Sequence, residues 1–153
     1  ISTLVFAKIL GAILFGIFNA FVPLVFAAFF INLNGINWAI TVIAVVLIAI
    51  TSALLGLLIA VSAKEVFEAQ TFSNFFRFPM LFLCGLFMPI DKLPTLLQPI
   101  SFCLPLTYGT DLLNNAIRAN SIFNDSFNIL IMLVYSILLF YLCQRNIEKK
   151  WIL

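Results

Sequence analysis

The sequence predicts an all-α membrane protein, a bundle of four transmembrane helices with a short outer helical hairpin between the third and the fourth. Apolar residues make up 64% of the 153-residue chain and charged residues only 9%, which is too apolar a composition for a water-soluble domain of this size. In addition, residues 9–63 include no Asp, Glu, Lys, Arg or His. Such a stretch indicates burial in lipid.

The charge-free stretch predicts two crossings, at 9–31 and 38–63. As a single helix it would be about 80 Å long at ~1.5 Å per residue, against a hydrocarbon core of ~30 Å, so the chain must turn back once. Asn and Gly interrupt the apolar pattern between the two spans and mark the turn, which reads Asn32-Leu33-Asn34-Gly35-Ile36-Asn37.

The third and fourth spans are predicted at 72–90 and 127–144. The third is expected to be bent, because Pro79 and Gly85 lie inside it and Pro89 lies near its end. The fourth follows a capping cluster at 124–126. It is closed by charged residues, namely Arg145, Glu148, Lys149 and Lys150.

The connection 91–125 is predicted to form the outer hairpin without crossing the membrane. Three prolines exclude one continuous spanning helix. Two short helices are expected instead, at 93–102 and 110–119, and the second has an apolar and a polar face. Its apolar face comprises Leu112, Leu113, Ala116 and Ile117, and its polar face Asp111, Asn114, Asn115 and Arg118.

The distribution of Lys and Arg predicts that both ends of the segment are cytoplasmic and that the protein is a multi-pass protein of the cell membrane. Cytoplasmic loops carry an excess of these residues. With both ends inside, the outer side holds only Lys92 and Arg118. The inner side holds Lys8, Lys64, Arg77, Arg145, Lys149 and Lys150.

Several function classes are disfavoured by what the sequence lacks. It has no phosphate-binding Gly-x-x-x-x-Gly-Lys-[Ser/Thr] loop, no His, no Gly-x-Ser-x-Gly elbow and no acidic or Cys cluster with metal-ligand spacing. We therefore expect no catalysis, no cofactor and no metal in this chain. Its net charge of +2, without clustered Lys and Arg, argues against nucleic acid as a partner.

Small residues recur at every fourth position in the first two spans. In lipid such stripes let helix backbones approach closely. We favour ordinary packing within the chain over a dimer interface or a sliding transport seam. The residues are Ala12, Gly16, Ala20, Ser52, Gly56 and Ala60.

Four polar residues in the inner third of the third segment form a stripe on one helix face, because they are spaced i, i+3, i+4 and i+7. They are Gln70, Ser73, Asn74 and Arg77. An Arg at the bilayer centre costs at least ~2.5 kcal/mol. Two interpretations stay open: Arg77 extends to the inner membrane surface, or the stripe forms the inner mouth of a transport path.

The inner loop between the second and third spans is short and charged but carries an aromatic side chain. It consists of Lys64, Glu65, Val66, Phe67 and Glu68. It could be a solvated connector or a docking site for a soluble partner, for which a single aromatic anchor is typical.

An ordered set of motifs resembles the permeases of type-2 ABC exporters over about 54–118. One departure is Asn114, where the family pattern often has an Arg, and Arg118 follows one turn later. The motifs are Glu68-Ala69-Gln70-Thr71-Phe72-Ser73-Asn74, Pro79, Leu83-Cys84-Gly85-Leu86-Phe87-Met88-Pro89-Ile90, Leu93-Pro94 and Pro105-Leu106-Thr107-Tyr108-Gly109-Thr110-Asp111.

This resemblance implies one half of a translocation path, paired with a second permease half in the lipid bilayer and powered by ATP on a separate or fused ATP-binding cassette. It also implies that residues 1–153 form a single permease domain that lacks the family's N-terminal amphipathic helix and first two of six spans. The loop 64–68 would contact the ATPase. The outer hairpin would include Pro89, Pro94, Pro105, Tyr108, Asp111 and Arg118.

Two other functions stay open from the sequence. A non-transporting assembly or anchoring subunit needs only apolar spans and small-residue stripes. A lipid-modifying membrane enzyme would need catalytic residues upstream of Ile1. Co-purification with an ATPase subunit would favour the permease.

Overall fold

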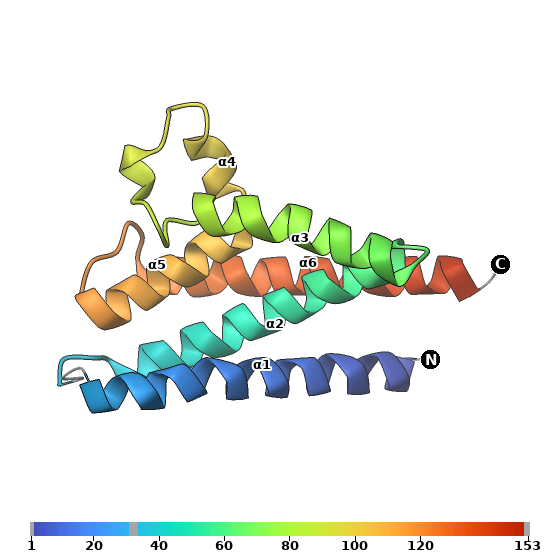
Figure 1. Cartoon of the computed structure of the whole chain (residues 1–153), viewed down its shortest axis with the longest axis horizontal. Helices are drawn as coiled ribbons and strands as arrows, with labels where there is room; N and C mark the ends of the chain where they lie inside the picture. Colours follow the sequence, from blue (N-terminus) through green and yellow to red (C-terminus); the bar gives the residue numbers. More distant parts are fainter. Residues whose placement is uncertain (1, 31–33, 152–153) are drawn as a thin grey trace.

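A computed structural model describes residues 2–30 and 34–151, and every regular element in them is a helix (Figure 1). This confirms the all-α prediction. The elements in chain order are α1 (Ser2–Phe30), α2 (Trp38–Ser62), α3 (Val66–Leu83), the 3-10 helix η1 (Ile90–Lys92), α4 (Gln98–Phe102), α5 (Pro105–Arg118) and α6 (Asp125–Trp151).

Within residues 2–30 and 34–151, three helices are long and apolar enough to cross a membrane: α1, α2 and α6. They correspond to the first, second and fourth predicted spans. The third predicted span is different, because α3 includes polar residues such as Glu68 and Arg77 and is not apolar enough to be counted with these helices. It also ends at Leu83 rather than at 90, since Gly85 adopts a φ of 84° that stops the helix.

The helices form a bundle around α2, which contacts α1, α3, α5 and α6. In Figure 1 the described chain termini and the α2–α3 turn lie at one end of the bundle, called here the terminal end. The end of α1, the start of α2 and the α5–α6 connection lie at the opposite end, the loop end. Both chain ends therefore share one side of the bundle.

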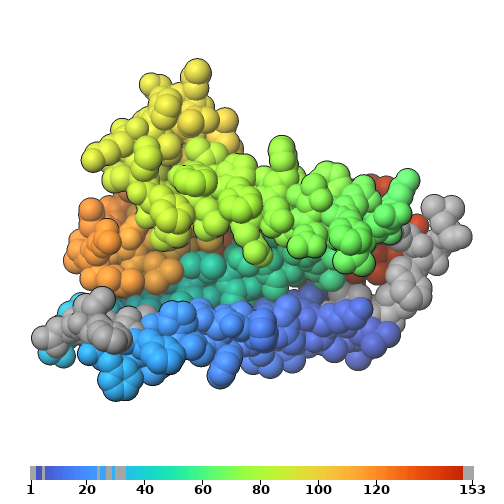
Figure 2. Space-filling model, viewed as in Figure 1, coloured from blue at the N-terminus to red at the C-terminus, as the bar shows by residue number. Residues whose placement is uncertain are grey.

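Two apolar clusters hold the bundle together. In the first, α2, α5 and α6 meet, and its buried residues are Ala44, Leu47, Tyr108, Leu112 and Met132. In the second, α1, α2 and α6 meet through Ile9, Leu54 and Leu139. By contrast, α3 has no buried side chain, and the segment 84–104 after it projects from the bundle (Figure 2).

The structure corrects the expected surface position of the second short helix. Helix α5 begins at Pro105 instead of 110, and most of its side chains up to Leu112 are buried between α2 and α6. Proline suits the first turn of a helix, where its missing N–H would be unpaired in any case. Asp111, assigned to an exposed polar face, is only 5% exposed. The first short helix is reduced from 93–102 to Gln98–Phe102.

Helix α5 ends at Arg118 and is capped by Ala119, which adopts a left-handed conformation with φ 53° and donates its N–H to the Asn115 carbonyl. A left-handed conformation is costly for residues other than Gly. Ala119→Gly should therefore raise the free energy of unfolding by about 1 kcal/mol, measured by thermal unfolding in detergent. The control Ala116→Gly, inside the same helix, should lower it. Unchanged or reduced stability of Ala119→Gly would contradict this.

Candidate functional site

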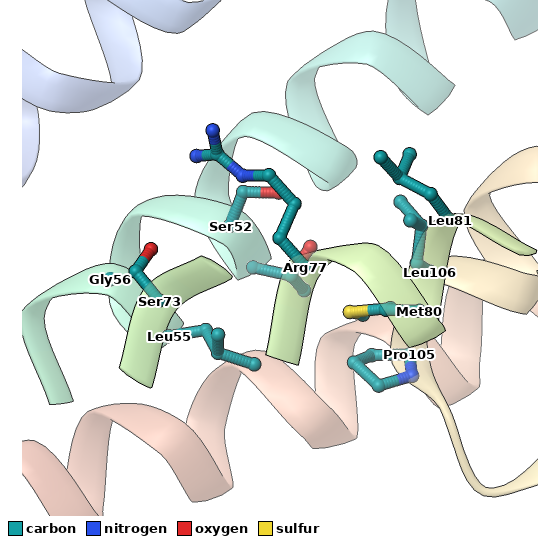
Figure 3. Close-up of a pocket in the computed structure, with 10 residues that line it drawn as sticks. Ser52, Leu55, Gly56, Ser73, Arg77, Met80, Leu81, Pro105 and Leu106 are labelled. Carbon is teal, nitrogen blue, oxygen red and sulfur yellow. The ribbon is translucent and has the colours of Figure 1, made fainter. Parts of the chain in front are cut away.

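A cavity of about 250 Å³ lies where α3 faces α2 and the start of α5, called here the groove (Figure 3). It brings together two predicted sets, because Ser52 and Gly56 belong to the small-residue stripe and Ser73 and Arg77 to the polar stripe. The lining residues are Thr51, Ser52, Leu55, Gly56, Ser73, Arg77, Met80, Leu81, Pro105 and Leu106.

The two glycines of the small-residue stripes differ in what they face. A Cβ atom built on Gly16 would lie 3.5 Å from the Ala49 Cβ, an ordinary contact between α1 and α2. A Cβ on Gly56 would meet nothing within 4 Å. The other stripe members, which are exposed in the single chain, are Ala12, Ala20, Ser52 and Ala60. Thus the α2 stripe opens space beside α3 instead of closing it.

Arg77 lies well away from both ends of the bundle. It lines the groove with Ser52, and Figure 3 shows its side chain extending beside Ser52. At ~1.5 Å per residue, Ser52 is about 21 Å from the start of α2 and about 15 Å from its end. Within the described part of the chain no carboxylate pairs with Arg77. The Arg77 side chain is exposed in the single chain.

Two members of the polar stripe lie outside the groove. Gln70 and Asn74 are exposed on α3 and do not line the cavity. Ser73 is half-buried and does line it. The stripe is therefore split, and only its Ser73–Arg77 edge faces α2.

The inner loop lies at the terminal end and exposes two apolar side chains. Val66 is 83% and Phe67 81% exposed. Glu68 has a structural role, because its Oε2 accepts a hydrogen bond of 2.9 Å from the Lys64 N–H. That bond closes the turn that leads into α3. Lys64 and Glu65 are exposed.

The Pro-Leu-Thr-Tyr-Gly-Thr-Asp motif attaches α5 to the projecting segment 84–104. Thr107 Oγ1 donates to the Ser101 carbonyl at 2.6 Å, and Thr110 Oγ1 to the Cys84 carbonyl at 2.7 Å. The Tyr108 hydroxyl donates to the Phe102 carbonyl at 2.7 Å. These three hydroxyls thus bond backbone carbonyls of the projecting segment to α5.

Asp111 connects three parts of the loop end. Its Oδ1 accepts the Ile122 N–H at 2.8 Å, and its Oδ2 accepts the Phe123 N–H at 3.0 Å and Asn128 Nδ2 at 2.9 Å. Sequence reasoning missed Asn128, which is fully buried on α6. An Asn inside an otherwise apolar span was the available signal.

A second hollow of about 450 Å³ lies at the loop end. Of the residues assigned to the outer hairpin, Pro89, Asp111 and Arg118 line it. Pro105 lines the groove instead, and Pro94 is exposed outside both cavities. The predicted hairpin residues therefore do not form one site.

The helices, the buried polar contacts at the loop end and the groove define a multi-pass α-helical membrane protein. Residues 1–118 match the family described as ABC-2 type transporter, and the chain belongs to this family of membrane permeases. This confirms the resemblance drawn from the motifs.

Nodulation protein J of Rhizobium leguminosarum bv. viciae is 30% identical over 117 residues, which cover 74% of this chain and 45% of that protein. The chain thus spans less than half the length of this curated relative. No solved structure matches the present chain.

Proposed function

We propose that this chain is the membrane-spanning permease component of an ATP-driven ABC exporter and forms half of a substrate translocation path. The observation that carries the proposal is the groove: Arg77 lines it far from both ends of α2, with no carboxylate partner among the described residues. A cation at that depth needs water, a ligand or a partner subunit, and a translocation path supplies them. Membership in the ABC-2 type transporter family supports a permease role.

The same proposal includes four crossings, with α3 as the third and both ends cytoplasmic, and a re-entrant outer hairpin. The position of α5 along α2 supports the re-entrant hairpin. Helix α5 begins beside Ser52 in the groove, and near its end the Ala116 carbonyl accepts the Asn37 N–H at 3.0 Å, next to the start of α2. Helix α5 therefore runs from about mid-span to the loop end, as a re-entrant helix would.

ATP would be bound and hydrolysed on a separate or fused cassette, and this chain would itself catalyse no reaction. A second permease half would cover part of the exposed aromatic surface of α3. This surface consists of Phe72, Phe75, Phe76, Phe78 and Phe82, all of which are exposed in the single chain. Closure of the cassettes would act on the inner loop and move α2 and α3 together.

Phe67→Asp is the test of the ATPase contact. Exposed aromatic anchors account for much of the affinity of an interface, so this change should lower the ATPase activity of the reconstituted full complex about tenfold, and the yield of a separate ATPase subunit on co-purification. Phe67 is preferable to Glu68, whose replacement would also remove the turn contact to Lys64.

Leu96→Asp is the matched control, because Leu96 is 85% exposed but lies on the projecting segment. It should leave both measurements unchanged. Full activity of Phe67→Asp, or an equal loss with Leu96→Asp, would contradict the assigned contact. A complete protein that never co-purifies with an ATPase would favour the anchoring subunit.

A further inference from the structure

The hydroxyl groups of α2 and α3 fall into two sets. Both helices are described throughout, and four of their Ser and Thr side chains donate to backbone carbonyls of the preceding turn: Thr41, Thr51, Ser62 and Thr71. This is the usual arrangement for a hydroxyl in a helix. Ser52 and Ser73 make no such bond, and these are the two serines that line the groove.

The groove therefore collects polar side chains that can donate hydrogen bonds. Arg77 carries five N–H donors and a fixed positive charge, and the hydroxyls of Ser52 and Ser73 are available beside it. No Asp or Glu lines the cavity. Such a set is complementary to an anion, and the planar guanidinium fits the oxygens of a phosphate in particular.

The rest of the groove is apolar. Leu55, Met80, Leu81 and Leu106 form its walls, and Pro105 contributes a backbone position without an N–H. A small hydrated anion would gain nothing from these walls. An apolar chain attached to the anion would bury surface against them.

The depth of the groove selects the source of such a ligand. Phosphates of resident bilayer lipids lie at the ends of spanning helices, whereas Ser52 lies about 15 Å from the nearer end of α2 at ~1.5 Å per residue. A phosphate reaches this depth when it is being carried across.

We propose that the groove binds the phosphate group of an amphiphilic cargo, with Arg77, Ser52 and Ser73 as its donors and the apolar walls against its chain. This inference rests on the proposed permease function, and it names the substrate class of that site: a phosphorylated amphiphile.

The test uses the full-length permease in dodecyl maltoside, with dodecyl phosphate as the probe and dodecyl glucoside as its neutral counterpart. Saturable thermal stabilisation reports binding. Arg77→Gln should raise the half-saturating concentration of dodecyl phosphate roughly 10- to 100-fold. Arg77→Lys should give a half-saturating concentration between those of wild type and Arg77→Gln, because Lys keeps the charge but lacks the paired N–H donors of the guanidinium. The Ser52→Ala/Ser73→Ala double variant should raise the half-saturating concentration of dodecyl phosphate several-fold.

Arg145→Gln is the matched control, since Arg145 is an exposed Arg on α6 outside both cavities, and it should bind dodecyl phosphate like wild type. Equal affinity of wild type and Arg77→Gln would overturn the proposal. Inorganic phosphate or dodecyl glucoside binding as tightly as dodecyl phosphate would do the same. So would native mass spectrometry showing phosphatidylglycerol retained by wild type and lost from Arg77→Gln, because that result assigns the groove to a resident lipid.

Binding and ATP coupling are measured separately, so the two proposals can fail separately. If Phe67→Asp lowers ATPase activity but Arg77→Gln leaves dodecyl phosphate binding intact, the chain is a permease with another cargo. If dodecyl phosphate binds through Arg77 but no ATPase partner exists, the permease proposal fails and the phosphate site stands.

Discussion

Asp111→Ala is expected to lower the free energy of unfolding by roughly 3 kcal/mol or more. The Asp111 carboxylate accepts two backbone N–H groups, from Ile122 and Phe123, and the Asn128 side-chain amide. Alanine leaves all three donors without their acceptor in a buried environment, and each unpaired buried donor costs about 1–3 kcal/mol. Asp111→Asn should cost less but still be destabilising, because its NH2 group would face at least one of these donors.

Thermal unfolding of the full-length protein in detergent measures the loss, and limited proteolysis at 119–124 measures release of the connection that Asp111 holds. Asp91→Asn is the matched control, since Asp91 is exposed on the projecting segment, and it should change neither measurement. An Asp111→Ala protein that unfolds like wild type would contradict the assigned role.

Gly109→Ala is expected to lower the free energy of unfolding by about 1–3 kcal/mol, and Gly109→Val by more. A Cβ atom on Gly109 would lie 2.5 Å from Ile48 Cγ1 and 3.1 Å from Met132 Cε. Ile48 cannot turn aside cheaply, because a β-branched side chain in a helix has one preferred rotamer. The absence of a side chain at Gly109 is what lets α5 lie against α2 and α6.

Gly11→Ala is the control for Gly109, because a Cβ there would meet nothing within 4 Å. In a helix this exchange should be neutral or stabilising by up to about 1 kcal/mol. Adding Ile48→Ala to Gly109→Ala should recover part of the loss, and thermal unfolding of the four proteins of this double-mutant cycle measures the coupling. Full additivity would show that the two side chains do not compete for space.

Local composition was sufficient to predict α1, α2 and α6. Each is a long apolar run, and an apolar run in lipid has to be helical because its backbone groups have no water to bind. The same reasoning extended the third span too far. Its predicted end included Gly85, whose positive φ stops α3 at Leu83, and periodicity does not report backbone conformation.

The two stripes were visible in the sequence, but their relation was not. Ser52 and Gly56 lie about twenty residues from Ser73 and Arg77 along the chain, and only the packing of α3 on α2 brings them to one groove. Asp111 shows the opposite case. Helical spacing placed it on a polar face, yet α6 supplies Asn128 to cover that face. Amphipathic spacing identifies a polar residue without showing whether water or another helix will meet it.

The amino-acid sequence by itself determined the all-α class, three of the four predicted spans as helices long and apolar enough to cross a membrane, and membership in the ABC-2 type transporter family, because hydropathy and ordered motifs are local properties. Only the tertiary structure decided that α5 is buried between α2 and α6 and that Arg77 and two free serine hydroxyls share one groove. Both depend on contacts between distant segments, which arise when Gly109 permits close approach and Asp111 satisfies the backbone of the following connection.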